Sequence, residues 1–122
     1  MKEIIKTHLP DLGPIEWAVK SDNVLYATMV PMNEDGSIEL GEAEAQVALT
    51  FENIKKTMEI AGGSTKDITM IQVFLTDLQY SRQVNELWTR YFEEPYPNRA
   101  TIIVSGLVAP GMIIECCFHA HL

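Results

Sequence analysis

The chain contains two stretches in which apolar residues recur every three or four positions, the spacing of one face of an α-helix. In the first, between Glu42 and Ala61, the recurring residues are Val47, Phe51, Ile54, Met58 and Ala61. In the second, which follows a capping residue at Asp77, they are Val84, Leu87, Trp88, Tyr91 and Phe92. The pattern predicts two amphipathic helices, the first ended by Gly62-Gly63 and the second by Pro95 and Pro97. The polar face of the first helix, which we expect in solvent, consists of Gln46, Glu52, Lys55, Lys56 and Glu59.

Short apolar runs bounded by turn residues predict the strands. Three runs precede the first helix, one lies between the helices and two follow the second: Ile4–Ile5, Trp17–Lys20, Val24–Val30, Ile68–Thr76, Arg99–Ser105 and Met112–Leu122. The run between the helices is apolar on both sides, which is typical of a central strand. In the last run, alternation puts Glu115, Cys117, His119 and His121 on one face and the apolar residues on the other.

The order of these elements, β-β-β-α-β-α-β-β, predicts an α+β fold with a single mixed sheet and two helices packed on one face. A length of 122 residues fits one domain, spanning residues 1–122. The other face of the sheet has no helix to cover it. We therefore expect the chain to associate with copies of itself.

Composition narrows the range of partners. The net charge is −8 with nine basic residues, which opposes binding to a nucleic acid because phosphate contacts need cations. No segment approaches the roughly 20 consecutive apolar residues of a membrane helix, so we expect no membrane partner. The N-terminus carries charges where a secretory signal needs apolar residues, which predicts a cytoplasmic protein.

The candidate chemistry lies between Pro97 and Glu115. Arg99 begins one predicted strand and Glu115 lies on the next, across a Pro-Gly turn, so we expect them on neighbouring strands. Such a pair can hold a small carboxylic acid and a water molecule together. His119 and His121 point the same way but have no third ligand at a suitable spacing, so we predict neither a metal nor a cofactor.

Several segments, taken in order, resemble the YjgF/YER057c/UK114 (RidA) family. The similarity covers about residue 10 to the C-terminus and rests on Gly13-Pro14, Glu44-Ala45-Gln46, Phe51–Lys55, Ala61-Gly62-Gly63, Val73–Asp77, Val84-Asn85, Tyr91-Phe92, Pro97–Thr101 and Ile114-Glu115. The resemblance implies a chorismate-mutase-like fold and a homotrimer with a cleft at each subunit interface. It also implies cofactor-independent hydrolysis of small imino or enamino acids, such as 2-iminopropanoate and 2-iminobutanoate, to 2-keto acids and ammonia.

The same resemblance gives Arg99 the role of binding the substrate carboxylate and Glu115 that of positioning the attacking water. Asn85 also matches the family, and we interpret it as structural. The older family label, endoribonuclease, gains no support from the acidic composition.

Four pocket positions depart from the family pattern. Ile15 stands where the family has tyrosine, Thr28 and Met29 where it has serine and glycine, and Thr101 where it has cysteine. Thr28 and Thr101 keep a small side chain with a hydroxyl, whereas Ile15 and Met29 add apolar volume. We expect all four to line the substrate pocket. The changes leave two readings: a deaminase with an altered substrate, or a stress-protective protein that binds small carboxylates without turnover.

Overall fold

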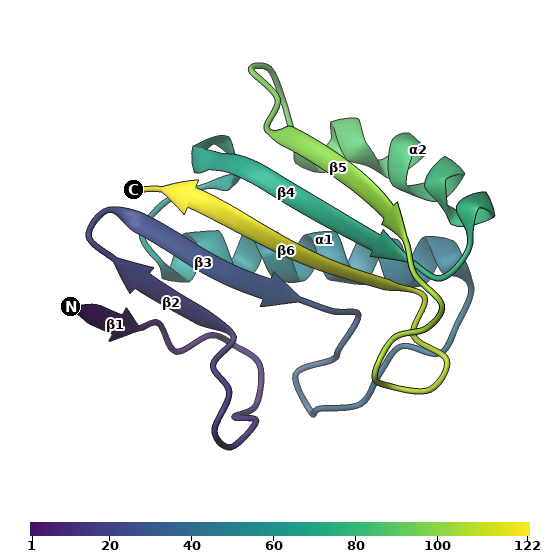
Figure 1. Cartoon of the computed structure of the whole chain (residues 1–122), viewed down its shortest axis with the longest axis horizontal. Helices are drawn as coiled ribbons and strands as arrows, with labels where there is room; N and C mark the ends of the chain where they lie inside the picture. The colour runs from purple at the N-terminus through teal and green to yellow at the C-terminus, as the bar shows by residue number, and fades with distance from the viewer.

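A computed structural model, which describes residues 1–122, confirms the predicted order of strands and helices (Figure 1). Two short 3-10 turns, Thr65–Asp67 and Leu78–Tyr80, are the only helical additions to it. The side chain of Asp77, expected to cap the second helix, caps the turn that leads into it, accepting from the backbone of Gln79 at 2.9 Å. The elements are β1 (Lys2–Ile4), β2 (Ala18–Ser21), β3 (Val24–Met29), α1 (Ala43–Ile60), β4 (Ile68–Leu75), α2 (Ser81–Tyr91), β5 (Asn98–Ile103) and β6 (Ile114–His121).

All six strands form one sheet in the order β1-β2-β3-β6-β4-β5. Strand β5 pairs with β4 in parallel, and the other neighbours are antiparallel. The expectation that the strands of Arg99 and Glu115 are neighbours is therefore wrong, because β4 lies between β5 and β6. A parallel pair needs a crossover connection. Helix α2 supplies it between β4 and β5, and β6 then takes the remaining place between β3 and β4.

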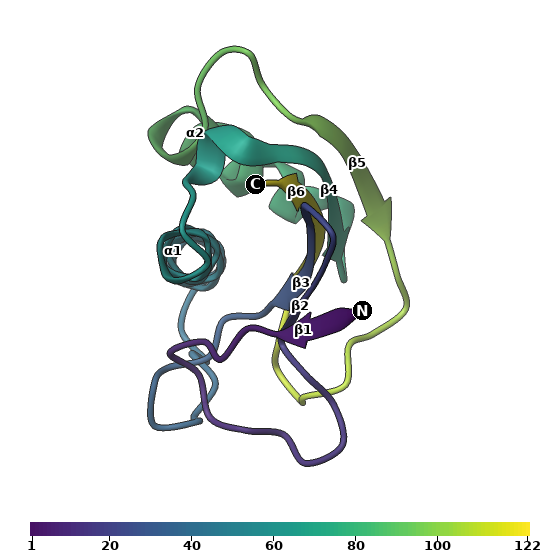
Figure 2. The same cartoon turned by 90° about the vertical axis from the view of Figure 1, so that its left-hand side faces the viewer.

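Both helices lie on one face of the sheet, as predicted (Figure 2). The core forms between them, and the alternation predicted for the last strand is confirmed: Ile114, Cys116, Phe118 and Ala120 are at most 1% exposed. On the helix side of the core, Phe51 packs edge-on against Trp88 and Phe92, with ring centroids 5.9 and 5.5 Å apart. Trp88 and Phe92 stack on each other at 4.2 Å, and their contacts with Phe51 pack α2 against α1.

Helix α1 ends as the glycine pair predicts, with Gly62 at a φ of +92°. Its polar residues behave differently from the expectation in one respect. Gln46, expected in solvent, is only 2% exposed because both ends of its amide are hydrogen-bonded to the segment before β6. Asn53 is equally buried and is bonded to the segment after β3. No helix in the structure has the length and apolar character needed to cross a membrane.

The face of the sheet without helices carries a mixed surface. Tyr26, 45% exposed, lies edge-on against His119 with ring centroids 4.9 Å apart. Thr28 lies opposite Cys117 in the register, and its hydroxyl is 3.4 Å from the thiol. This face, with Val19, Phe74 and Ile102 partly exposed beside these residues, is called the open face below.

Candidate functional site

Glu115 lies in a hollow of about 370 Å³ at the edge of the open face. The hollow is bounded by the loop before β2, the segment after β3 and the loop before β6. It is lined by Leu12, Ile15, Glu16, Trp17, Thr28, Val30, Met32, Ile38, Val108, Ala109, Met112 and Glu115. Three predicted site residues, Ile15, Thr28 and Glu115, thus meet in one place. The volume falls within the range of about 300 to 1,000 Å³ typical of sites for small molecules.

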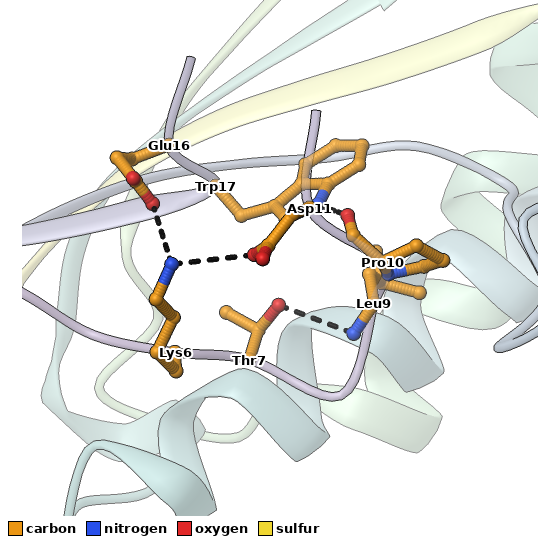
Figure 3. Close-up of polar contacts among 7 residues, drawn as sticks. All are labelled: Lys6, Thr7, Leu9, Pro10, Asp11, Glu16 and Trp17. Carbon is orange, nitrogen blue, oxygen red and sulfur yellow. Dashed lines mark hydrogen bonds and ion pairs between the residues drawn. The ribbon is translucent and has the colours of Figure 1, made fainter. Parts of the chain in front are cut away.

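The loop before β2 forms the wall that carries Leu12 and Ile15, and Figure 3 shows how it is held. The indole nitrogen of Trp17 donates to the carbonyl of Pro10 at 2.8 Å, which closes the loop on itself. At the surface, the amine of Lys6 lies 3.3 Å from Asp11 and 3.7 Å from Glu16. These bonds keep the loop over the hollow although Ile15 itself is 63% exposed.

Buried amides on α1 hold the other two walls. The amide nitrogen of Asn53 donates to the carbonyls of Val30 and Met32, both at 2.9 Å. The amide of Gln46 donates to the carbonyl of Gly111 and accepts from the backbone of Ile113, again at 2.9 Å. Buried polar groups are stable only when they are paired in this way. The two walls are therefore fixed to one rigid helix.

The carboxylate of Glu115 is half-buried and has no hydrogen-bond or ion-pair partner in the chain. Its partial burial raises its pKa, because a low-dielectric surrounding disfavours the charged form. A carboxylate with a raised pKa and free lone pairs can accept a proton from a water molecule. The role expected for Glu115, positioning an attacking water, stays a prediction.

Arg99 lies outside the hollow, on the face of β5 that turns toward α2. Its guanidinium donates to the side-chain oxygen of Asn85 at 2.8 Å and lies 4.6 Å from the centre of the Trp88 ring. No carboxylate is within 4.0 Å of it, so its charge is uncompensated. Partial burial lowers its pKa, but arginine remains protonated in proteins. An oriented, unpaired guanidinium of this kind suits a ligand carboxylate.

Arg99 and Glu115 do not meet within one chain. In the register, Arg99 is opposite Ile71 and Glu115 is opposite Phe74, three residues further along β4 and on its other side. This offset is about 10 Å along the strands and about 10 Å across them. Alternation also places the two side chains on opposite faces, because Ile71 is buried under the helices and Phe74 lies on the open face.

The remaining predicted pocket residues divide in the same way. Thr28 borders the hollow of Glu115 and a second hollow of about 330 Å³ on the open face. Thr101 is exposed on the same face of β5 as Arg99. Met29 is not in the pocket: it is fully buried under α1, where the hydroxyl of Thr57 lies 3.3 Å from its sulfur. A strand residue between two open-face positions must point into the core, which is why that expectation fails.

Sequence reasoning missed two features of the site. Asn85, interpreted as structural, is exposed and orients Arg99, and Trp88 has a second role as the surface on which Arg99 rests. The spacing of Asn85 and Trp88, one helical turn apart, places both on one side of α2 and was the available signal. The apolar residues of the hollow come from separate loops, and no local pattern links them.

Comparisons with known proteins find relatives that match nearly the whole chain. The family model described as endoribonuclease L-PSP matches residues 7–122. The 3-aminoacrylate deaminase RutC of Acinetobacter baylyi is 36% identical over 115 residues, which cover 93% of this chain and 90% of that protein. The crystal structure of the Rid family protein YyfA from Yersinia pestis is 30% identical, with a TM-score of 0.93 and 100% of both chains covered. That of Escherichia coli TdcF with bound serine is 28% identical, with a TM-score of 0.88 and 98% of both chains covered.

Proposed function

The chain belongs to the YjgF/RidA family, and we propose that it is a cofactor-independent deaminase that hydrolyses imino and enamino acids to 2-keto acids and ammonia. The strongest support is the unpaired guanidinium of Arg99, held by Asn85 and Trp88 in the absence of any carboxylate. An arginine whose neighbours are all neutral is available for an acidic substrate. The named activity of the RutC relative, the deamination of 3-aminoacrylate, belongs to the same class of reaction.

In the proposed reaction, Arg99 binds the carboxylate of the imino acid and Glu115 accepts a proton from a water molecule. The water oxygen attacks C2, and the electron pair of the C=N bond moves to nitrogen. The proton held by Glu115 passes to this nitrogen, which gives a neutral carbinolamine. Glu115 then takes the proton of the C2 hydroxyl and transfers it to nitrogen as the C–N bond breaks, so that C2 becomes a carbonyl, ammonia leaves and the carboxylate is regenerated. The imine carbon is already electrophilic, so the side chains need only to bind, orient and exchange a proton.

The two half-sites require two copies of the chain. One half-site consists of Arg99, Asn85, Trp88 and Thr101, and the other of Glu115, Thr28 and the hollow. We place one active site at each interface of a homotrimer, where the arginine half-site of one copy faces the glutamate half-site of the next. The apolar residues of the open face support this assembly, since a monomer would leave them in water.

The test is an assay of ammonia release. A PLP-dependent dehydratase acting on serine generates 2-aminoacrylate and 2-iminopropanoate, and the protein should accelerate their hydrolysis to pyruvate. Glu115→Gln should lower kcat about 10²- to 10⁴-fold, the usual contribution of a general base. Arg99→Ala should lower kcat/KM by a factor that corresponds to about 2 to 5 kcal/mol.

Matched controls are Arg82→Ala, an arginine of α2 that pairs with Glu86 at the surface, and Glu59→Gln on the exposed side of α1. Both should retain full activity. If the wild-type protein leaves the background rate of hydrolysis unchanged, the proposed reaction is wrong.

A second function is favoured by one comparison. The TdcF structure contains bound serine, a small carboxylic acid, so the same arginine could bind metabolites without turnover. Thermal denaturation with pyruvate or 2-oxobutanoate tests this reading. It predicts stabilisation that disappears in Arg99→Ala but persists in Arg82→Ala, with no release of ammonia in the coupled assay.

A further inference from the structure

The hollow beside Glu115 is larger than the smallest imino acids require. Its volume of about 370 Å³ equals the share of roughly a dozen water molecules in the liquid. An imino acid derived from alanine or serine has only a handful of non-hydrogen atoms, and its carboxylate lies at Arg99 in the proposed reaction, outside the hollow. Most of the volume would then remain filled with water.

The lining of the hollow is mostly apolar. Nine of its twelve lining residues are hydrophobic, and the others are Glu16, Thr28 and Glu115. Val108 and Ile15 are 96% and 63% exposed, so their apolar surfaces contact water whenever the hollow has no ligand. An apolar group that enters releases this water, which favours binding. An anionic group gains nothing here, since the lining contains no lysine or arginine.

We infer that this hollow is the side-chain pocket of the active site and selects imino acids with aliphatic or aromatic side chains over 2-iminopropanoate. The inference rests on the proposed function. With the carboxylate at Arg99 and C2 beside Glu115, the side chain of the substrate extends between Ile15, Met32 and Val108. An acidic side chain is rejected by the carboxylates of Glu16 and Glu115.

The shape of the hollow favours a ligand over a second copy of the chain. Its walls are two loops and the segment after β3, each held by its own hydrogen bonds to Pro10, Gly111 or Val30. These bonds keep the space open in the isolated chain. The open face, in contrast, offers a broad surface for the neighbouring copy, and the hollow opens at its edge beside Glu115.

The experiment compares kcat/KM for two imino acids generated in situ by an L-amino-acid oxidase, one from alanine and one from leucine, with acceleration of ammonia release as the readout. Burial of a methylene changes binding about fourfold, which corresponds to about 0.8 kcal/mol. The leucine-derived substrate has three more carbons and should be preferred by roughly 60-fold. Ile15→Asn should lower this ratio several-fold, while Ile60→Asn, a matched exposed isoleucine at the end of α1, should leave it unchanged.

The outcomes separate the two proposals. If both substrates are hydrolysed but kcat/KM for the leucine-derived one does not exceed that for the alanine-derived one, the side-chain pocket is refuted and the proposed deaminase activity stands. The side-chain pocket is also refuted if Ile15→Asn and Ile60→Asn lower this preference to the same extent. Failure to accelerate the hydrolysis of either substrate overturns the deaminase and the pocket with it.

Discussion

Because Arg99 and Glu115 are far apart within one chain, we predict that two inactive variants, one at each residue, restore activity when they are mixed. Arg99→Ala removes the arginine half-site of a chain and Glu115→Gln removes its glutamate half-site. In one chain the two residues are on opposite faces of the sheet and about 10 Å apart in each direction of its plane. If each site takes one half from each of two copies, mixing the variants should restore activity.

The expected recovery follows from the geometry. In a closed ring of copies, each interface takes its arginine from one chain and its glutamate from the next. Random 1:1 mixing leaves each half-site intact with a probability of about one half, so both are intact at about one quarter of the interfaces. The mixture should therefore regain about one quarter of the wild-type activity per chain, whatever the number of copies in the ring.

The assay is ammonia release by Arg99→Ala and Glu115→Gln chains that are co-expressed in equal amounts and purified through one tag that both carry, so that every combination of the two is recovered. A second mixture gives an independent reading: wild-type chains with chains that carry both substitutions. Sites shared between copies predict about one quarter of wild-type activity in this mixture, and sites within one chain predict about one half. Absence of recovery in the first mixture, or one half in the second, would refute the reasoning from the sheet order.

Three further predictions follow from the buried amides and from Glu115. Asn53→Ala leaves the carbonyls of Val30 and Met32 unpaired and should lower the free energy of unfolding by about 2 to 4 kcal/mol. Urea titrations at fixed protein concentration measure this change. The control, Asn33→Ala in an exposed loop, should change the free energy of unfolding by less than about 0.5 kcal/mol. A smaller effect of Asn53→Ala would show that it does not hold the wall. Burial raises the pKa of Glu115, so kcat/KM should fall on acidification at a higher pH than for an ordinary glutamate, and a pH profile without this limb would exclude Glu115 as the base. Because the pKa of Glu115 is raised in the folded state, its contribution to stability is full below the unfolded pKa and is lost as the pH rises through the folded pKa. Glutamine cannot ionise, so Glu115→Gln should be more stable than wild type at pH 8 and equal to it at pH 4. Urea midpoints at the two pH values measure this difference.

The elements of the fold could be predicted from the sequence because each is determined locally. The helical spacing of Val47, Phe51, Ile54 and Met58 fixes the buried face of α1, and all four residues are fully buried. The alternation in β6 likewise identifies its core face. The neighbours of each strand were not predictable in this way, because pairing depends on contacts far apart in the chain. The placement of β5 beside β4 follows from the crossover through α2, which the spacing of residues does not reveal.

The candidate site shows the same limit. Arg99, Glu115, Ile15 and Thr28 were predicted from the motif and its departures, and the structure places three of them in one hollow. Met29 was misplaced because a position next to the pocket in sequence lies on the other face of a strand. The joint role of Asn85 and Trp88 depends on the packing of α2 against β5, which required the three-dimensional arrangement.

The position of β5 connects assembly with chemistry. It is an edge strand, its partner β4 covers only one side, and Thr101 and Ile103 next to Arg99 remain exposed, Ile103 by 46%. Edge strands with exposed apolar residues favour association with another chain. The surface that carries the guanidinium therefore gains from being covered, and the open face beside Glu115 gains in the same way. If a neighbouring copy covers both surfaces, the free energy of association also brings the arginine half-site of one chain to the glutamate half-site of the next. A dissociated chain would then have no complete active site.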